Sequence, residues 1–455
     1  MTGAIAVLDI GKTNVKLALF APDGALLWTR SRPNHVAPGP PYPHADVEAI
    51  DAFLFDALSE ARRIAPIEAI APTTQGCAGA LVDGAGLVLP VMDYEFAGVD
   101  EIEPSYAPSR PPFAETYSPP LSRGLNLGKQ IAWQKRNFPA AFARARFYLT
   151  YPQYWAWRLS GAAASEVTML GAHTDLWNPL RGAPSSLASA LGIVALLPPL
   201  RRAYDRLGPL KPEVAAATGL GDEVGVLCGI HDSNASLLPH LASRKPPFTI
   251  VSTGTWVILM AVGLGLDHLD PADDTLANVD VEGRPVACAR FMGGREYSEI
   301  AAGAPENADA GALSRVIAAR AMALPCFSAQ GGPFSSRKGE IRGAVAPGDR
   351  PALAKLYLAL MTDLMLTRLG AGAGELIVEG SLAADSLTCG LLAALRPAQS
   401  LYTAADAAGT ARGAALLAQW PPRAFLPPPL KPVDPARVEG LEAYREAWTA
   451  AVRAG

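Results

Sequence analysis

The sequence is poor in cysteine, and its five cysteines, Cys77, Cys228, Cys288, Cys326 and Cys389, lie singly along 455 residues. This spacing excludes the close cysteine pairs of zinc sites and dithiol redox motifs. Scattered single cysteines are typical of reduced, buried thiols in a cytoplasmic protein.

Charge is also sparse, since only 18% of the residues are charged and the formal net charge is -4. No run of lysine and arginine marks a nucleic-acid surface, so we expect no nucleic-acid partner. Half of the residues are hydrophobic, which excludes disorder over long stretches and predicts a well-buried globular protein.

A signal peptide and a membrane anchor are not expected either. Asp9, Lys12 and Lys16 interrupt the apolar N-terminus, so export is not predicted. Residues 246–266 carry no charge and are long enough to span a bilayer, which leaves a transmembrane helix as an alternative. Their prolines, threonines and glycine favour two buried strands, FTIVS and TWVILMAV, joined by a tight turn.

The length predicts two domains of about 200 residues each, with a ligand cleft between them. The stretch 242–247, with two cations and two prolines, is the best linker candidate. We therefore expect an N-terminal domain over residues 1–241 and a C-terminal domain over residues 248–455.

Apolar runs alternate with helical patterns along the chain, which predicts the α/β class. Predicted strands cover residues 4–9, 15–20, 25–30, 67–74, 224–230 and 375–380, and predicted helices cover residues 46–63, 391–395 and 410–420. Residues 97–210 are interpreted as an insertion on the first domain. Their aromatic cluster at 151–157 favours helix packing, with a sugar platform as the alternative.

Two predicted hairpins end in small, polar turns. In the first, Gly11, Thr13 and Asn14 let backbone N–H groups approach phosphate oxygens, and Lys12 and Lys16 add positive charge. The second turn, at residues 252–255, offers the same small donors through Thr253, Gly254 and Thr255. Each could also be an ordinary hairpin turn.

Two carboxylates stand at the ends of predicted strands. Asp9 is suited to a Mg²⁺ ion that bridges phosphates. Asp232 follows a buried strand and precedes a helix, where it could accept a proton as general base or serve as a helix N-cap. His231 and Asn234 beside it could reach a polyol.

Four segments resemble the FGGY carbohydrate kinases, in the same order along the chain: residues 9–14 (DIGKTN), 229–232 (GIHD), 252–255 (STGT) and 409–415 (GTARGAA). The resemblance implies two ribonuclease-H-like domains of the superfamily that joins actin, heat-shock chaperone ATPases and sugar kinases, with ATP and sugar in an interdomain cleft. The chain differs from many members in having lysine at 12, where threonine is common, and aspartate at 385, where asparagine is common.

Site roles follow from the resemblance position by position. Asp9 would hold Mg²⁺, and Asp232 would be the catalytic base. The ATP-binding residues implied by the resemblance and by the two turns are Gly11, Lys12, Thr13, Asn14, Lys16, Thr253, Gly254, Thr255, Gly380, Asp385 and Gly413. The sugar-binding candidates are Gln75, Gly76, Asp93, His173, His231 and Asp232. Tyr94 and Glu95, which follow the same apolar run as Asp93, could also supply partners for sugar hydroxyls.

The expected activity is ATP-dependent phosphorylation of a small sugar, a ketose such as L-fuculose, L-rhamnulose, xylulose or ribulose, in a cytoplasmic enzyme. Alternatives are a kinase of glycerol, erythritol, an aldonate or another polyol, an ATPase switch of the chaperone or actin kind, and a sugar-binding regulator without catalysis. Enzymes of this size are commonly dimers, so a homodimer is one expectation.

Overall fold

The computed structural model describes residues 3–304, 308–328, 331–404, 409–422, 427 and 429–454. The chain divides into two compact units. The first runs to Arg244 and also contains Ala277–Pro285 and helix α15 (Gly409–Leu416), whereas the second begins at Lys245. The sequence analysis expects a single boundary between residues 241 and 248. Two later segments group with the first unit, so the expected domain ranges stay a proposal.

A seven-stranded sheet forms the centre of the first unit, in the order β11-β12-β6-β1-β2-β3 with β13 also beside β6. The hairpin β1–β2 and its neighbour β3 are antiparallel, whereas β6 runs parallel to β1, β12 and β13. The strands are β1 (Ala4–Ile10), β2 (Asn14–Phe20), β3 (Leu26–Pro33), β6 (Ile67–Thr74), β11 (Arg206–Pro209), β12 (Gly225–Leu227) and β13 (Ile230–His231).

The second unit repeats this plan in its own seven-stranded sheet, in the order β16-β17-β15-β14-β20-β21-β22. Here β14 is antiparallel to β15 and parallel to β20. The strands are β14 (Phe248–Thr253), β15 (Val257–Val262), β16 (Thr275–Val279), β17 (Pro285–Phe291), β20 (Glu375–Gly380), β21 (Leu401–Ala404) and β22 (Leu430–Pro432). An antiparallel run of three strands followed by parallel strands occurs in both sheets, so the predicted pair of ribonuclease-H-like, actin-like ATPase folds is confirmed.

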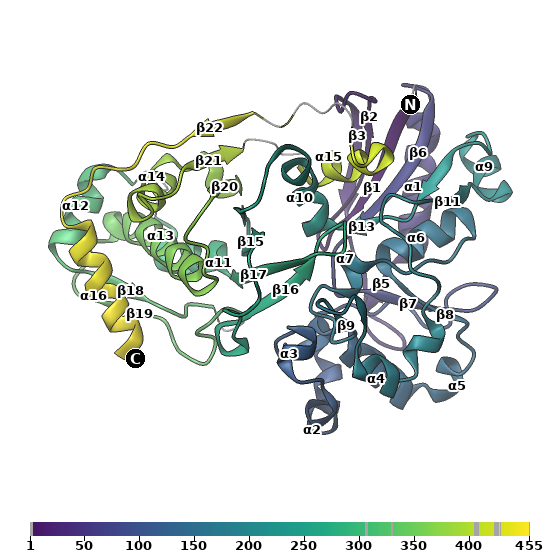
Figure 1. Cartoon of the computed structure of the whole chain (residues 1–455), viewed down its shortest axis with the longest axis horizontal. Helices are drawn as coiled ribbons and strands as arrows, with labels where there is room; N and C mark the ends of the chain where they lie inside the picture. Colours follow the sequence, from purple (N-terminus) through teal and green to yellow (C-terminus); the bar gives the residue numbers. More distant parts are fainter. Residues whose placement is uncertain are drawn as a thin grey trace. The chain divides into compact units, whose positions relative to one another are not determined.

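Alternation along β1 explains why its sheet has two covered faces. Ala6 and Leu8 pack with Leu54 of α1 (Val47–Ala61), whereas Val7 packs on the other face with Ala414 of α15. Successive side chains of a strand point to opposite faces, so a continuous apolar run fits a sheet with helices on both sides. Figure 1 shows α15 next to α10 (Asp232–Ser243) on the second of these faces.

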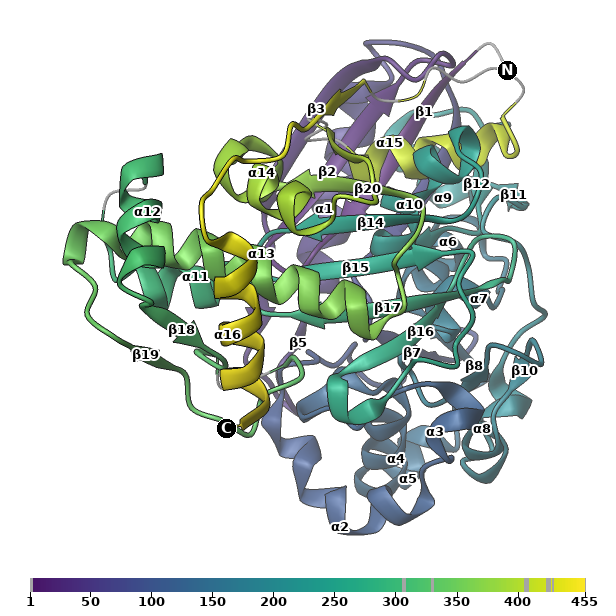
Figure 2. The ribbon, with the colours of Figure 1, turned by 60° about the vertical axis from the view of Figure 1, so that its left-hand side comes forward.

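Helix α13 (Arg350–Arg368) is the long helix of the second unit, and Figure 2 shows it crossing in front of β14 and β15. It packs on α11 (Gly293–Ala301), α12 (Ala310–Ala318) and α14 (Ser386–Leu395). The sequence analysis did not predict the last helix, α16 (Leu441–Ala454). Its Trp448 is buried and donates a 2.7 Å hydrogen bond from Nε1 to the Ala323 carbonyl.

Short elements dress both units. In the first unit they are β4 (Val36–Ala37), β5 (His44–Ala45), β7 (Gly79–Val82), β8 (Phe147–Thr150), β9 (Trp177–Asn178), β10 (Ala183–Pro184), α2 (Glu103–Tyr106), α3 (Phe113–Thr116), α4 (Leu127–Asn137), α5 (Pro139–Phe142), α6 (Tyr151–Ser160), α7 (Val167–Leu170), α8 (Ser186–Ala190) and α9 (Pro212–Thr218). The second unit adds β18 (Met322–Leu324) and β19 (Glu340–Arg342). The aromatic cluster of α6 is buried, with Tyr151 and Trp155 almost inaccessible, so its interpretation as helix packing is confirmed.

One predicted strand is wrong in detail. Residues 224–230 do not form a single strand, because Gly229 has φ +89° and separates β12 from β13. A Cβ at Gly229 would lie 2.6 Å from the Pro72 carbonyl oxygen, so the chain approaches β6 more closely than any other residue allows.

The uncharged stretch 246–266 contains β14 and β15, as predicted. Within the described part of the chain, no helix combines the length and the apolar character needed to cross a bilayer.

Candidate active site

The C-terminal ends of three strands meet at one edge of the first sheet. Asp9 of β1 pairs with Thr73 of β6, and Thr73 also pairs with Ile230 of β13. The residues that follow these strands therefore emerge side by side. Ligands of open α/β sheets bind beyond the carboxyl ends of parallel strands, so this edge is the natural place for a site.

Asp9 lies at this edge with its carboxylate mostly buried. Burial raises the pKa of Asp9 to about 6, a rise that the nearby Lys16 opposes and the charge of Asp232 reinforces. The Lys16 ammonium is 3.7 Å from the Asp9 carboxylate. Two carboxylates from different strand ends are thus close enough to repel one another.

Asp232 is the first residue of α10, and His231 occupies the N-cap position. The alternative interpretation of Asp232 as the N-cap is therefore wrong. Its Oδ1 accepts a 2.6 Å hydrogen bond from the Ser233 N–H and lies 3.3 Å from His231 Nε2. The carboxylate remains about one third exposed, which leaves it accessible to a substrate.

Lys12 lies in the β1–β2 turn but contacts a loop of the same unit. Its ammonium pairs with Asp93 and, at 3.1 Å, with Glu95, and it stands 4.8 Å above the Tyr94 ring. Asn14 of the same turn donates a hydrogen bond to the Thr13 hydroxyl at the surface. The lysine charge is therefore partly neutralised before any phosphate binds.

Gln75 and Gly76 continue β6 into this edge. The Gln75 N–H donates to the Ile10 carbonyl, and among the described residues Gln75 Oε1 is buried without a hydrogen-bond partner. A Cβ at Gly76 would lie 2.8 Å from His231 Nε2, so glycine makes room for the imidazole. A buried, unsatisfied acceptor at a strand end is a feature expected of a polar ligand site.

His173 comes from a loop after α7 and contacts Cys77, with Sγ 3.6 Å from Nδ1. Both residues adopt left-handed backbone conformations, with φ +44° for His173 and +59° for Cys77. Such strain is retained mainly where a site needs it. The sequence analysis treated Cys77 only as a buried thiol, and a non-glycine residue with positive φ leaves no signal in a sequence.

Tyr94 lies between Asp93 and Glu95, and the sequence analysis expects all three to offer partners for sugar hydroxyls. Burial raises its pKa above the usual range, and the charges of Cys77, Glu95, Asp93 and Asp232 raise it further. Its phenol therefore stays protonated and lies among the predicted sugar-binding residues, where it can donate or accept a hydrogen bond.

The second turn belongs to the second unit. Thr253 Oγ1 donates to the Glu379 carbonyl and accepts a 2.9 Å hydrogen bond from the Leu382 N–H, so this hydroxyl fixes the end of β20. Gly254 and Thr255 are exposed at the tip of the turn. A Cβ at Gly380 would lie 1.9 Å from the Thr253 carbonyl oxygen.

Asp385 and Gly413, two residues predicted to contact the nucleotide, are in contact with other residues of the protein. Asp385 caps α14 by accepting hydrogen bonds from Leu387 and Thr388, and it pairs with Lys355 at 3.0 Å. Gly413 belongs to the first unit, where a Cβ would lie 1.8 Å from the Ala235 carbonyl oxygen of α10. Close packing of α15 on α10 thus accounts for this glycine.

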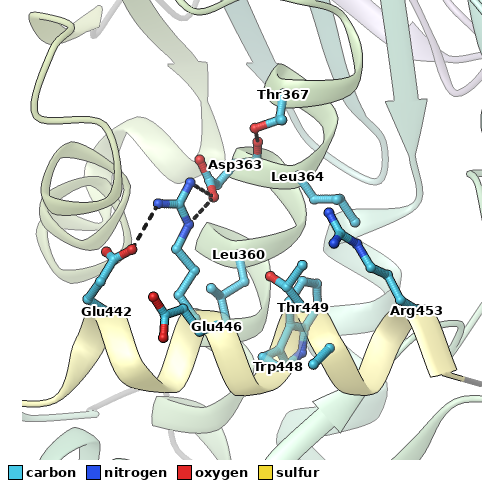
Figure 3. A pocket seen from close by; sticks show the side chains of 11 residues that line it. Leu360, Asp363, Leu364, Thr367, Glu442, Glu446, Trp448, Thr449 and Arg453 are labelled. Atoms are coloured by element: carbon cyan, nitrogen blue, oxygen red, sulfur yellow. Dashed lines mark hydrogen bonds and ion pairs between the residues drawn. The ribbon is translucent and has the colours of Figure 1, made fainter.

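A groove in the second unit lies apart from these residues in the sequence. It runs between α13 and α16, and its polar side chains include Asp363, which pairs with Arg445 at 2.8 Å (Figure 3). None of its lining residues is a predicted site residue. Arg445 pairs with both Asp363 and Glu442.

A metal ion would fit beside Asp9. No cluster of three or more histidine, cysteine, aspartate or glutamate side chains occurs among the described residues, which excludes a preformed all-protein cage there. Mg²⁺ commonly takes only one or two protein carboxylates together with substrate phosphates. The raised pKa of Asp9 reflects burial and the charge of Asp232, and a bound divalent cation would offset both.

Comparison with known proteins matches a large part of the chain to two family domains. Residues 121–239 match the N-terminal domain of the FGGY family of carbohydrate kinases, and residues 245–425 match the carbohydrate kinase FGGY C-terminal domain. L-Fuculokinase from Escherichia coli (strain K12) is 29% identical over 275 residues, which are 58% of this chain and 57% of that protein.

Solved structures cover the whole chain. A xylulose kinase from Rhodospirillum rubrum has the same fold, with a TM-score of 0.81 at 18% identity over 99% of this chain and 98% of that one. A carbohydrate kinase from Novosphingobium aromaticivorans is 36% identical, with a TM-score of 0.91 over 100% of this chain and 99% of the other. The chain therefore belongs to the FGGY family of carbohydrate kinases.

Proposed function

We propose that this chain transfers the γ-phosphoryl group of ATP to a hydroxyl of a small sugar, a ketose such as L-fuculose, L-rhamnulose, xylulose or ribulose. The observation that carries the proposal is the meeting of Asp9 and Asp232 at one sheet edge, where they couple electrostatically. One carboxylate is suited to a metal ion and the other, partly exposed, to a proton. The names of the relatives support a sugar as acceptor.

In this proposal Asp232 takes the proton of the attacking hydroxyl. Gln75 Oε1 and the Asp93 carboxylate accept hydrogen bonds from other hydroxyls of the sugar, since both are acceptors near this edge. His173 and Tyr94 are proposed to contact the acceptor as well. Phosphoryl transfer requires mainly orientation and charge stabilisation, so these contacts set the attack angle.

Each unit is proposed to offer donors to nucleotide phosphates. Gly11, Thr13, Asn14 and Lys16 offer donors in the first unit, and the exposed Gly254 and Thr255, held by Thr253, offer donors in the second. Gly380, Asp385 and Gly413 would shape the surroundings of the adenosine through the packing described above. Asp9 would hold Mg²⁺, which supplies positive charge to the phosphates when it is bound.

A cytoplasmic setting is part of the same proposal. In the part of the chain that the structure describes, the five cysteines are buried and form no disulfide, which suits a reducing compartment.

The test is ADP release measured with ATP, Mg²⁺ and each of the four ketoses, with glycerol and erythritol in parallel. We expect release that depends on one ketose. Asp232→Ala should lower turnover by about 10²–10⁴-fold with binding of a non-hydrolysable ATP analogue retained. Asp222→Ala removes an exposed carboxylate of the same unit and should change nothing.

Three outcomes would overturn parts of the assignment. ADP release that ignores every sugar would favour an ATPase switch, and activity with glycerol or erythritol alone would favour a polyol kinase. Near-normal turnover by Asp232→Ala would exclude Asp232 as the base.

A further inference from the structure

His231 is held by a chain of contacts that begins at a backbone carbonyl. The Asn234 side-chain amide donates from Nδ2 to the carbonyl oxygen of Val279, a residue of the segment 277–285 in the same unit. A carbonyl oxygen only accepts hydrogen bonds, so the amide nitrogen has to face it. The orientation of Asn234 is therefore fixed.

This orientation determines which imidazole nitrogen carries the proton. Asn234 Oδ1 then faces His231 Nδ1 at 3.1 Å. Because an amide oxygen only accepts, Nδ1 has to carry the hydrogen. In the neutral ring the other nitrogen, Nε2, is left with a lone pair.

That lone pair is directed at the proposed base. His231 Nε2 lies 3.3 Å from Asp232 Oδ1, and Gly76 lacks a side chain that would separate the imidazole from this edge. His231 and Asn234 are both almost completely buried, whereas Asp232 is partly open. The Nε2 lone pair and the ionised carboxylate are both acceptors and repel one another. A proton between Nε2 and Oδ1 turns this repulsion into a hydrogen bond.

We propose that His231 is the proton-sharing partner of Asp232, so that the two side chains, and not Asp232 alone, hold the proton removed from the sugar. This inference rests on the proposed kinase function. In this proposal His231 acts on the base, and both of its ring nitrogens face groups of the protein.

The proposed step balances as follows. The sugar O–H bond breaks as its oxygen forms the new bond to the γ-phosphorus, and the bond from that phosphorus to the β–γ bridging oxygen breaks, with its electron pair leaving on ADP. The proton moves to Asp232 and is shared with His231 Nε2, which gives an imidazolium beside a carboxylate. It returns to solvent after the product leaves.

Other titratable groups surround His231 and Asp232, and they determine which control variants the test needs. Asp9 acts on Asp232 through its charge, and Tyr94 senses the same carboxylate. On the α7 side, Thr168 Oγ1 accepts a 3.1 Å hydrogen bond from the His231 N–H and donates to Glu166 at 2.6 Å. Burial raises the pKa of Glu166 to about 7, so it could also titrate near neutral pH.

The kinetic test compares pH–rate profiles of the full chain with its best ketose. In His231→Gln, turnover should fall by about 10–100-fold with little change in either KM, and the acidic limb of the profile should move to lower pH, because the more basic site is gone. Glu166→Gln and the exposed His35→Gln should leave that limb in place. A limb that moves with Glu166→Gln and not with His231→Gln would overturn the proposal.

A spectroscopic test does not depend on activity. With ¹⁵N-labelled histidine, the signals of His231 among the six histidines are those lost in His231→Gln. We expect a neutral ring with hydrogen on Nδ1 at pH 8 in the wild-type chain, and a mixture of tautomers in Asn234→Ala. A ring protonated on Nε2, or an imidazolium at pH 8, would overturn the proposal.

The two proposals fail in different ways. If no sugar is phosphorylated, the kinase function fails while the tautomer can still be measured. If Asp232→Ala abolishes activity and His231→Gln retains both the wild-type rate and the wild-type limb, only the role of His231 is excluded.

Discussion

The two turns that follow the first strand of each sheet share a topology and differ in chemistry. In both, the strand is antiparallel to its hairpin partner and parallel to the strand on its other side. The β1–β2 turn lies among charged groups, including Asp9, Lys16 and the pair of Lys12 with Asp93. The β14–β15 turn presents the neutral Gly254 and Thr255 on a backbone held by Thr253.

Under the proposed function, this difference is a division of labour on a repeated fold. Acid–base and metal chemistry require charges at strand ends, and the first sheet supplies them at the cost of repulsion between carboxylates. Binding a polyphosphate through neutral donors requires a well-defined backbone and small side chains, which the second turn has. Each turn should therefore respond to a different kind of substitution.

The largest effect on stability should come from the end of β20, which lies beside the second turn. Gly380 has φ 80° and ψ -150°, a conformation essentially limited to glycine, and a Cβ there would meet the Thr253 carbonyl. We expect Gly380→Ala to lower the free energy of unfolding by about 3–5 kcal/mol, measured by urea denaturation. Gly372→Ala, where a Cβ would meet nothing within 4 Å, is the matched control. Equal stability of the two variants would show that the turn is not held by this contact.

An intermediate effect, a gain in stability, should come from removing the charge of Asp9 beside the first turn. The pKa of Asp9 is raised from 3.8 to about 6 in the folded chain, so its ionisation opposes folding. The penalty is absent below pH 3.8, grows as the pH rises and is complete above pH 6. Asp9→Asn should therefore raise the free energy of unfolding at pH 7.5 by about 1–3 kcal/mol, and by little at pH 4.

Thermal unfolding at both pH values checks this prediction, and kinase assays should show that the stabilised variant has lost activity. Asp23→Asn, in the turn between β2 and β3, keeps its acceptor for the Ala25 N–H and serves as the control. A variant that is destabilised equally at both pH values would argue against a charge penalty at Asp9.

The smallest effect should come from Lys12. Its ammonium is bound by Asp93 and Glu95 and is partly exposed, so Lys12→Thr should change stability by less than about 1 kcal/mol. Because the lysine orients the loop at residues 93–95, we expect KM for the sugar to rise by about 2–5-fold and KM for ATP to stay constant. Lys135→Thr removes an equally charged, exposed side chain of the same unit. A rise in KM for ATP alone would support the predicted contact of Lys12 with phosphate.

Much of the fold was predictable because its strands are short apolar runs with local turn signals. Both hairpins, β6 and β20 are found where the sequence analysis expected them. The break between β12 and β13 was not predictable, because it depends on the approach of Gly229 to Pro72, a residue far away in the sequence. Helix α16 was missed because its buried Trp448 finds its partner 125 positions earlier.

The sequence by itself determined which chemistry is available: carboxylates and small polar turns at strand ends, in the order of a family of sugar kinases. Only the tertiary structure decided how those groups are used, because their partners lie far away along the chain. Lys12 meets Asp93 across 81 positions, and Asn234 meets Val279 across 45. Hydrogen-bond direction and ion pairing act over a few ångströms, so the roles of Lys12 and His231 depend on which residues folding brings into contact.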